Sequence, residues 1–254
     1  MTTRVLVFGY KHRLFGGSYI FRYYLSKALI ELGYETWLFG VRIPGIEELE
    51  RNFGQELLKL NVLKFNLPPL LERSIYTKMA SIWLFDYALR KLNPEIAFVD
   101  FDLYRKLQHS KTKIVEYVHW LTEAQALSTM SVKYQHGFWH YYYKLYSILY
   151  RGFARKDPFE EADVVLTNSF YTAMLIKKYF RREPLVLYPP VDVEQFHKHS
   201  HTPFNERKGI ITISRIGKDH NLELLIRLAK HIEEPVIIVG AVSDYEYYKE
   251  LKAL

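Results

Sequence analysis

Short apolar segments alternate with longer amphipathic segments from the start of the chain. Residues 4–9 (RVLVFG) and 34–40 (YETWLFG) are apolar runs of the kind that predict buried strands. Between them, residues 19–33 predict a helix that ends at Gly33. The apolar face of this helix is expected at Ile20, Tyr24, Ala28 and Leu32. The order of strand, helix and strand is a βαβ unit, which predicts a parallel sheet.

The same alternation continues to about residue 188. Further strands are expected at 59–65, 95–100, 113–118, 162–169 and 184–192. Residues 67–92 predict a helix that begins after two prolines, because proline suits a helix entry and not its interior. Another helix is expected to run to Tyr179, with Asn168 or Ser169 as its N-cap. We therefore expect an α/β fold with one complete Rossmann-like domain at residues 1–188.

A different composition separates this domain from the rest of the chain. Residues 189–208 hold three prolines, three histidines and several polar residues, so they are expected to be an interdomain linker. The histidines alternate at 197, 199 and 201, but no carboxylate or thiol cluster accompanies them, so a solvated linker is favoured over a zinc site. Residues 209–254 then predict strand, helix, strand and helix, the beginning of a second Rossmann-like domain.

Composition narrows the partners. The chain has a formal net charge of +7 and 16% aromatic residues, which favours contact with an anion such as a phosphate or a membrane surface. The sequence has no helix-turn-helix or RNA-binding signature, so its positive charge is the only feature that supports a nucleic-acid partner. We therefore expect no nucleic-acid partner. The chain has no cysteine, which suits a cytoplasmic location, and no apolar stretch is long enough to predict a membrane span.

Ligands of an open α/β sheet bind at the carboxyl ends of the strands, so the loops after residues 9, 100, 118, 167, 214 and 240 are candidate sites. Gly16 and Gly17 precede a helix, where they suit either an anion site or a tight turn. His119 ends a predicted central strand and would either face the ligand or be a core histidine. Arg215 and Lys218 lie in a strand-to-helix loop, where they suit a diphosphate or are simply solvated charges.

Residues 133–156 predict a helix on which basic, aromatic and apolar stripes lie side by side. Such a helix either lies in a membrane interface or packs against its own domain. The candidate lipid contacts are Trp139, Tyr143, Lys144, Tyr146, Arg151 and Arg155.

These residues together resemble the family 4 glycosyltransferases, which are retaining enzymes of the GT-B fold. The resemblance rests on TNSFYTAMLIKKYF (167–180) with LYPPVDVEQF (187–196), and on ISRIGKDHNLELLI (213–226). VEYVHW (115–120) and YYYKLYSILYRGF (141–153) are most similar to the branch of α-1,2-mannosyltransferases that extend lipid-linked oligosaccharides. The resemblance implies sugar transfer from a GDP- or UDP-linked donor to a lipid-linked or glycan acceptor at a cytosolic membrane face.

The resemblance also implies roles for individual residues. Arg215 and Lys218 would hold the donor diphosphate, Gly16 and Gly17 would approach phosphate and acceptor, and His119 would lie beside the donor sugar as the catalytic residue. No metal, other cofactor or enzymic nucleophile is expected.

The family's carboxylate motif, two glutamates eight residues apart, lies beyond Leu254. The chain is therefore expected to be truncated by about a hundred residues, inactive alone, and to expose apolar strand edges that another segment or chain covers. A nucleotide-sugar epimerase of the same fold and a non-catalytic fragment that binds acceptor or membrane are the alternatives.

Overall fold

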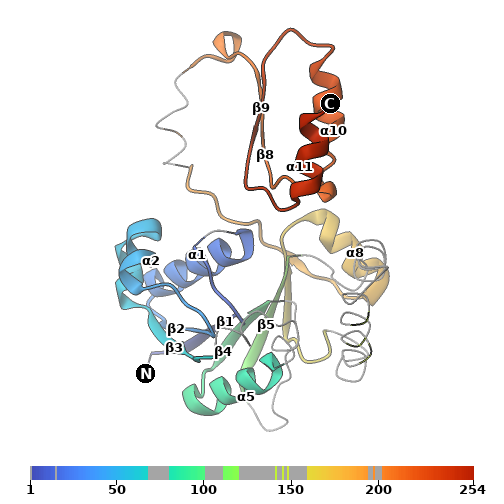
Figure 1. Ribbon diagram of the computed structural model, residues 1–254. Helices are drawn as coiled ribbons and strands as arrows, with labels where there is room; N and C mark the ends of the chain where they lie inside the picture. Colours follow the sequence, from blue (N-terminus) through green and yellow to red (C-terminus); the bar gives the residue numbers. More distant parts are fainter. Residues whose placement is uncertain are drawn as a thin grey trace. The chain divides into compact units, whose positions relative to one another are not determined.

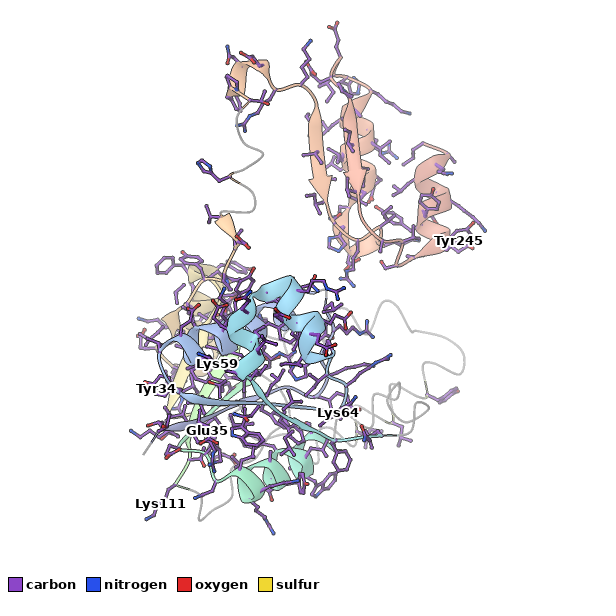
Figure 2. The ribbon with its side chains drawn as sticks, turned by 90° about the vertical axis from the view of Figure 1, so that its left-hand side faces the viewer. Tyr34, Glu35, Lys59, Lys64, Lys111 and Tyr245 are labelled. Atoms are coloured by element: carbon purple, nitrogen blue, oxygen red, sulfur yellow. The ribbon has the colours of Figure 1, made fainter. Side chains whose placement is uncertain are left out.

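The computed structural model describes residues 2–14, 16–67, 80–100, 111–119, 141, 145, 148, 159–193, 197 and 202–254. The chain divides into two compact units, Met1–Pro190 and Val191–Leu254, which we call unit 1 and unit 2. Figure 2 draws their described side chains, with Glu35 at the start of β2 in unit 1 and Tyr245 at the start of α11 in unit 2.

Unit 1 is built on a parallel sheet. Its strands are β1 (Arg4–Phe8), β2 (Glu35–Gly40), β3 (Asn61–Lys64), β4 (Ile96–Asp100), β5 (Lys113–Val118), β6 (Val164–Thr167) and β7 (Leu185–Val186). They form one seven-stranded sheet in the order β3-β2-β1-β4-β5-β6-β7, and every pairing is parallel. The predicted α/β class is confirmed. The strand order reverses between β1 and β4, which is where open sheets of this type bind their ligands.

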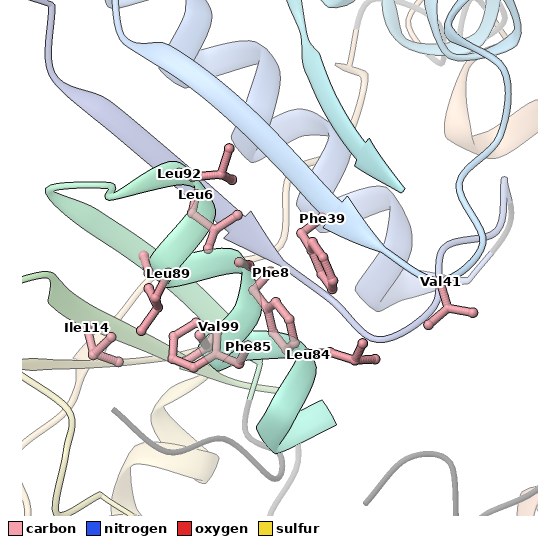
Figure 3. Close-up of a cluster of buried hydrophobic side chains, with 12 residues drawn as sticks. Leu6, Phe8, Phe39, Val41, Leu84, Phe85, Leu89, Leu92, Val99 and Ile114 are labelled. Atoms are coloured by element: carbon pink, nitrogen blue, oxygen red, sulfur yellow. The ribbon is translucent and has the colours of Figure 1, made fainter. Parts of the chain in front are cut away.

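Helices cover both faces of this sheet. α1 (Gly17–Glu31) and α2 (Ile46–Phe53), followed by the 3-10 turn η1 (Gln55–Lys59), lie on one side, and α5 (Ser81–Leu92) lies on the other (Figure 1). In the core beneath α5, Phe8 of β1 packs edge-on against Phe85 at 4.9 Å and stacks on Phe39 of β2 at 5.2 Å (Figure 3). The central strands β1 and β2 are largely buried on both faces, as their apolar runs predict, whereas β3, β6 and β7 toward the edges of the sheet are partly exposed.

The apolar face expected for α1 is wrong. The helix buries Phe21, Arg22, Tyr23, Ser26 and Leu29, whereas Leu32 is 74% exposed and Ala28 is also exposed. The buried face therefore includes an arginine and a serine, which the search for apolar spacing passed over. The buried arginine is central to the site described below.

α8 (Phe170–Phe180) begins as predicted. Ser169 is its N-cap, and the Ser169 Oγ accepts a hydrogen bond from the Thr172 backbone N–H at 3.2 Å. The following strand is shorter than expected, because β7 covers only Leu185–Val186 and Leu187 adds one bond to Thr167 O. Pro189 and Pro190 lack the N–H groups that would extend the ladder.

Unit 2 is smaller. The parallel strands β8 (Ile210–Ile213) and β9 (Val236–Val239) are accompanied by α10 (Leu222–Ala229) and α11 (Tyr245–Lys252), with 3-10 turns η2 (Phe204–Glu206) and η3 (Lys218–His220). Leu222, Tyr247 and Leu251 from the two helices form its core with Ile238 of β9. The alternate residues of the strands, Ile211, Ile213, Ile237 and Val239, are exposed, so one face of this small sheet is apolar and open to solvent.

Candidate active site at the carboxyl edge of the sheet

Four neighbouring strands of unit 1 deliver polar residues to the same edge of the sheet. β1 runs into Gly9, β4 ends at Asp100, β5 runs into His119, and β6 runs into Asn168. Because β1, β4, β5 and β6 are adjacent and parallel, these residues share the carboxyl edge.

The helix that follows β1 presents an open N-terminus. Gly16 is the N-cap of α1 with φ 126°, a backbone conformation that favours glycine. No side chain caps this helix, and an added Cβ on Gly17 would meet nothing within 4 Å. Both glycines are exposed, so backbone N–H groups at the positive end of α1 are accessible to an anion.

His119 is held from three directions. Asn168 Nδ2 donates a hydrogen bond to the His119 backbone carbonyl at 2.8 Å. The imidazole ring lies edge-on to Tyr117 at 4.6 Å and to Phe21 at 5.4 Å, and those two rings stack on each other at 3.8 Å. Tyr117 is itself anchored, since its hydroxyl donates to Leu187 O at 2.8 Å, and burial raises the pKa of that hydroxyl to about 12.

A buried arginine and a carboxylate extend from His119 into the unit. Asp100 Oδ1 lies 3.7 Å from His119 Nε2, and Asp100 Oδ2 lies 3.4 Å from Arg22 Nη2. Burial alone would raise the pKa of Asp100, but the Arg22 guanidinium and His119 together hold that pKa below its ordinary value. Asp100 is therefore an ionised carboxylate between two nitrogen-bearing side chains.

Two strand-end glycines make room for this cluster. An added Cβ on Gly9 would lie 1.4 Å from Arg22 Nη1, and one on Gly40 would lie 2.3 Å from the His12 ring. His12 Nε2 donates to the Phe39 carbonyl at 2.8 Å, while its buried Nδ1 has no hydrogen-bond partner in the described part of the chain. Burial, followed by the Arg22 charge, lowers the pKa of His12 from 6.5 to about 3, so this side chain is neutral.

In unit 2, Arg215 and Lys218 lie in the loop after β8, as predicted, and each contacts a carboxylate. Arg215 Nη2 is 3.3 Å from Asp219 Oδ2, and Lys218 Nζ is 3.3 Å from Glu250 Oε1 on α11. All four side chains are well exposed. Exposed ion pairs of this kind are worth about 0–1 kcal/mol, so an anion of higher charge can compete for both cations.

The six candidate lipid contacts, Trp139, Tyr143, Lys144, Tyr146, Arg151 and Arg155, lie outside the described residues. Three described positions in the same segment, Tyr141, Leu145 and Ile148, are helical, share one helix face by their spacing, and are all exposed. None of the helices in the described part of the chain has the length and apolarity needed to cross a bilayer. The described residues also contain no cluster of three or more histidine or acidic side chains placed to hold a metal ion.

Sequence comparison identifies the family. Residues 15–195, more than two thirds of the chain, match Glycosyltransferase Family 4. The chain belongs to this family. No curated protein sequence matches the chain.

Solved glycosyltransferases share the fold of this family 4 chain. A glycosyltransferase from Rickettsia africae is similar with a TM-score of 0.55 and 14% identity, over 99% of this chain and 64% of that protein. Anabaena Alr3699/HepE, solved with UDP and glucose, is similar with a TM-score of 0.52 and 12% sequence identity, over 98% of this chain and 64% of that protein. An α-glucosyltransferase solved with UDP and DNA is similar with a TM-score of 0.52 and 12% sequence identity, over 100% of this chain and 60% of that protein. The chain thus spans less than two thirds of the length of these GT-B neighbours.

Sequence reasoning missed Arg22, Asp100, His12 and the contact that Asn168 makes with His119. Asp100 carried a usable signal, because it ends an apolar strand at the edge where ligands bind. Arg22 and His12 carried none that a single sequence reveals, since their importance follows from burial that only the fold creates.

Proposed function

We propose that this family 4 chain is part of a retaining glycosyltransferase that moves a hexose, mannose by its resemblance, from a GDP- or UDP-linked donor to a lipid-linked acceptor. This sugar transfer would take place on the cytosolic face of a membrane. The observation that carries the proposal is the family membership of residues 15–195 together with the polar carboxyl edge that the same residues form.

The proposed role of unit 1 is to bind anionic and hydroxyl groups. The exposed Gly16–Gly17 step and the open N-terminus of α1 suit a phosphate, because helix N-termini attract negative charge. His119, fixed at its backbone by Asn168, suits a sugar hydroxyl or a developing charge beside it. Anabaena Alr3699/HepE, which shares the fold, was solved with UDP and glucose, and it supports a nucleotide-sugar ligand for this chain.

The proposed role of unit 2 is to stabilise the departing nucleoside diphosphate. When the glycosidic bond to the donor breaks, negative charge develops on the diphosphate, and preorganised cations lower the energy of that transition state. Arg215 offers a planar fork and Lys218 a point charge, which are the two geometries that bind phosphate oxygens. Their present partners, Asp219 and Glu250, would be displaced at small cost.

The proposed membrane contact is the segment at 133–156, which the sequence predicts to be a helix. Its described members Tyr141, Leu145 and Ile148 form an exposed apolar face, which suits insertion at the boundary of headgroups and acyl chains. We expect liposomes with anionic lipid to float the chain, and the change of Lys144, Arg151 and Arg155 to glutamate to abolish flotation. Equal flotation of this variant would refute the membrane contact.

Calorimetric titration of the chain with UDP and GDP tests the donor site. We expect one of the two nucleotides to bind, and Arg215→Met or Lys218→Met to weaken it by about tenfold or more, because charge-assisted hydrogen bonds are worth about 1.5–3 kcal/mol. Glu250→Gln should strengthen binding by about twofold to fivefold, since it frees Lys218.

Lys230→Met is the matched control, because Lys230 is an exposed lysine at the far end of α10. A chain that binds neither nucleotide, or that loses equal affinity in the Lys218 and Lys230 variants, would overturn the donor site. Product analysis with a nucleotide-sugar separates transfer from epimerisation, because only an epimerase returns an altered nucleotide-sugar without an acceptor.

A further inference from the structure

We propose that Asp100, locked in place by Arg22, sets the tautomer and ring orientation of His119, so that Nε2–H points at Asp100 and Nδ1 is the nitrogen left for a ligand. The inference rests on the proposed function only in naming the ligand, which would be a hydroxyl of the donor or acceptor sugar. Arg22 and Asp100 are thus positioning residues that act through His119.

His119 Nε2 is a buried atom. It is inaccessible to solvent and has no hydrogen-bond partner among the described residues, although the side chain as a whole is 25% exposed. The charged atom that faces it is Asp100 Oδ1 at 3.7 Å. A bare nitrogen lone pair would repel that carboxylate, whereas an N–H is attracted to it, so Nε2 must carry a proton. A small rotation of the ring shortens this contact to a hydrogen bond, as catalytic contacts often tighten when ligand binds.

Arg22 leaves Asp100 no other arrangement. Arg22 is 4% exposed, its Nε donates to Ser18 O at 3.2 Å, and its Nη1 occupies the space that Gly9 leaves open. Its Nη2 faces Asp100 Oδ2, so Oδ1 is the oxygen turned toward His119. The arginine therefore fixes the carboxylate both in charge and in direction.

The other contacts of His119 leave one degree of freedom of its ring unset. Asn168 fixes the backbone carbonyl, and the rings of Phe21 and Tyr117 fix the plane of the imidazole. A rotation of the ring by half a turn keeps those contacts but exchanges nitrogen and carbon positions. Asp100 is the group that distinguishes the two orientations, because only one of them places Nε2–H on its carboxylate.

This arrangement has a chemical consequence for the site. With Nε2–H committed to Asp100, neutral His119 offers Nδ1 as an acceptor for one sugar hydroxyl. Partners of this kind behind a metal-ligating histidine are worth about 10–100-fold in affinity or activity, and we expect an effect at the low end of that range at this metal-free site. Stability alone would not require the fixed orientation of Asp100 between Arg22 and His119, since a buried ion pair often contributes no more stability than apolar residues of the same size.

The test is the ¹⁵N spectrum of the His119 ring in the whole chain without ligand, assigned with the His119→Gln variant, at a pH where imidazole is neutral. We expect the Nε2–H tautomer in the unchanged protein. In Asp100→Asn, Arg22 attracts the amide oxygen, so the amide NH₂ turns to His119 and Nε2 must become an acceptor. More than about half of His119 should then change to the Nδ1–H tautomer.

The matched control is Glu35→Gln, which removes a carboxylate from the Arg4 pair of the same unit, far along the chain from His119. It should leave the His119 spectrum unchanged. An unchanged protein with Nδ1–H, or an Asp100→Asn spectrum that keeps Nε2–H, would overturn the proposal. Arg22→Lys, which keeps the positive charge, should retain Nε2–H, whereas Arg22→Met should give a mixture of both tautomers.

Binding of UDP- and GDP-sugars supplies the second readout, because the chain by itself is expected to be inactive. Asp100→Asn should weaken binding of the nucleotide-sugar by about tenfold and binding of the free nucleotide by less than about twofold, because the positioning acts on the sugar and not on the diphosphate. The two proposals fail separately. A tautomer that ignores Asp100 refutes the positioning role whatever the affinity, and a chain that shows the expected tautomers but no nucleotide-sugar binding refutes the donor site alone.

Discussion

The buried His12 makes the stability of unit 1 depend on pH between about 6.5 and about 3. Its pKa is lowered from 6.5 to about 3, first by burial and then by the Arg22 charge. The unfolded chain therefore binds a proton at His12 as the pH falls below about 6.5, and the folded chain does not until about pH 3. Stability is lost as pH falls across this interval and is constant above it.

The linkage relation gives the size of the effect. Between pH 7 and pH 5 the free energy of unfolding should fall by about 2 kcal/mol from His12 alone. Asp100 does not contribute in this window, because its pKa is lowered from 3.8 and its share of the stability is lost only in more acidic solution. Glu35, lowered from 4.5 by its bond to Arg4, likewise titrates below the window.

Urea denaturation followed by tryptophan fluorescence measures this quantity for unit 1, because all four tryptophans lie within its bounds. His12→Gln keeps a donor for the Phe39 carbonyl and removes the titration, so its stability should change by less than about 0.5 kcal/mol from pH 7 to pH 5. His231→Gln, at an exposed position of unit 2, is the control and should behave as the unchanged chain does. Parallel losses in the unchanged chain and in His12→Gln would refute the reasoning.

Two further predictions concern backbone positions. Gly240→Ala places a Cβ 1.8 Å from the Ser214 backbone carbonyl oxygen, so the free energy of unfolding of unit 2 should fall by about 1–3 kcal/mol. Faster proteolysis of unit 2 would show this loss. In the control Gly45→Ala the added Cβ meets no atom within 4 Å, so proteolysis should stay unchanged. Ser169→Ala removes the N-cap bond to Thr172 and should lower the stability of unit 1 by about 1 kcal/mol in urea, and an unchanged midpoint would contradict that role of the cap.

The strands of unit 1 were predictable because their apolar runs reflect burial in a parallel sheet. Those of unit 2 were predictable because runs of isoleucine and valine are typical of strands, even though one face of that sheet is open to solvent. The edge that carries the site was predictable too, since it follows from strand direction and not from side-chain detail. His119, Arg215 and Lys218 could therefore be placed on loops before any coordinates were known. Whether they bind what their positions suggest stays a prediction.

The partners of these residues could not be predicted, because they are distant in sequence. Arg22, Asp100 and His119 come from a helix and two strands, and Lys218 meets Glu250 from another helix. The orientation of α1 was wrong for a related reason. The prediction assumed that a buried helix face is apolar, but here the core offers Arg22 a carboxylate and Ser18 O, which make its burial tolerable.

The strand order has a consequence for the path by which unit 1 folds. β1 pairs with β2, which begins at Glu35, and on its other side with β4, which begins at Ile96. The first pairing closes a loop of about thirty residues and the second a loop of about ninety, so chain entropy favours formation of the β1-α1-β2 part before β4 docks. Until then Arg22 has no counter-ion from Asp100. The arrival of β4 therefore extends the sheet beyond β1 and neutralises the buried arginine in one event, which couples the folding of the two halves.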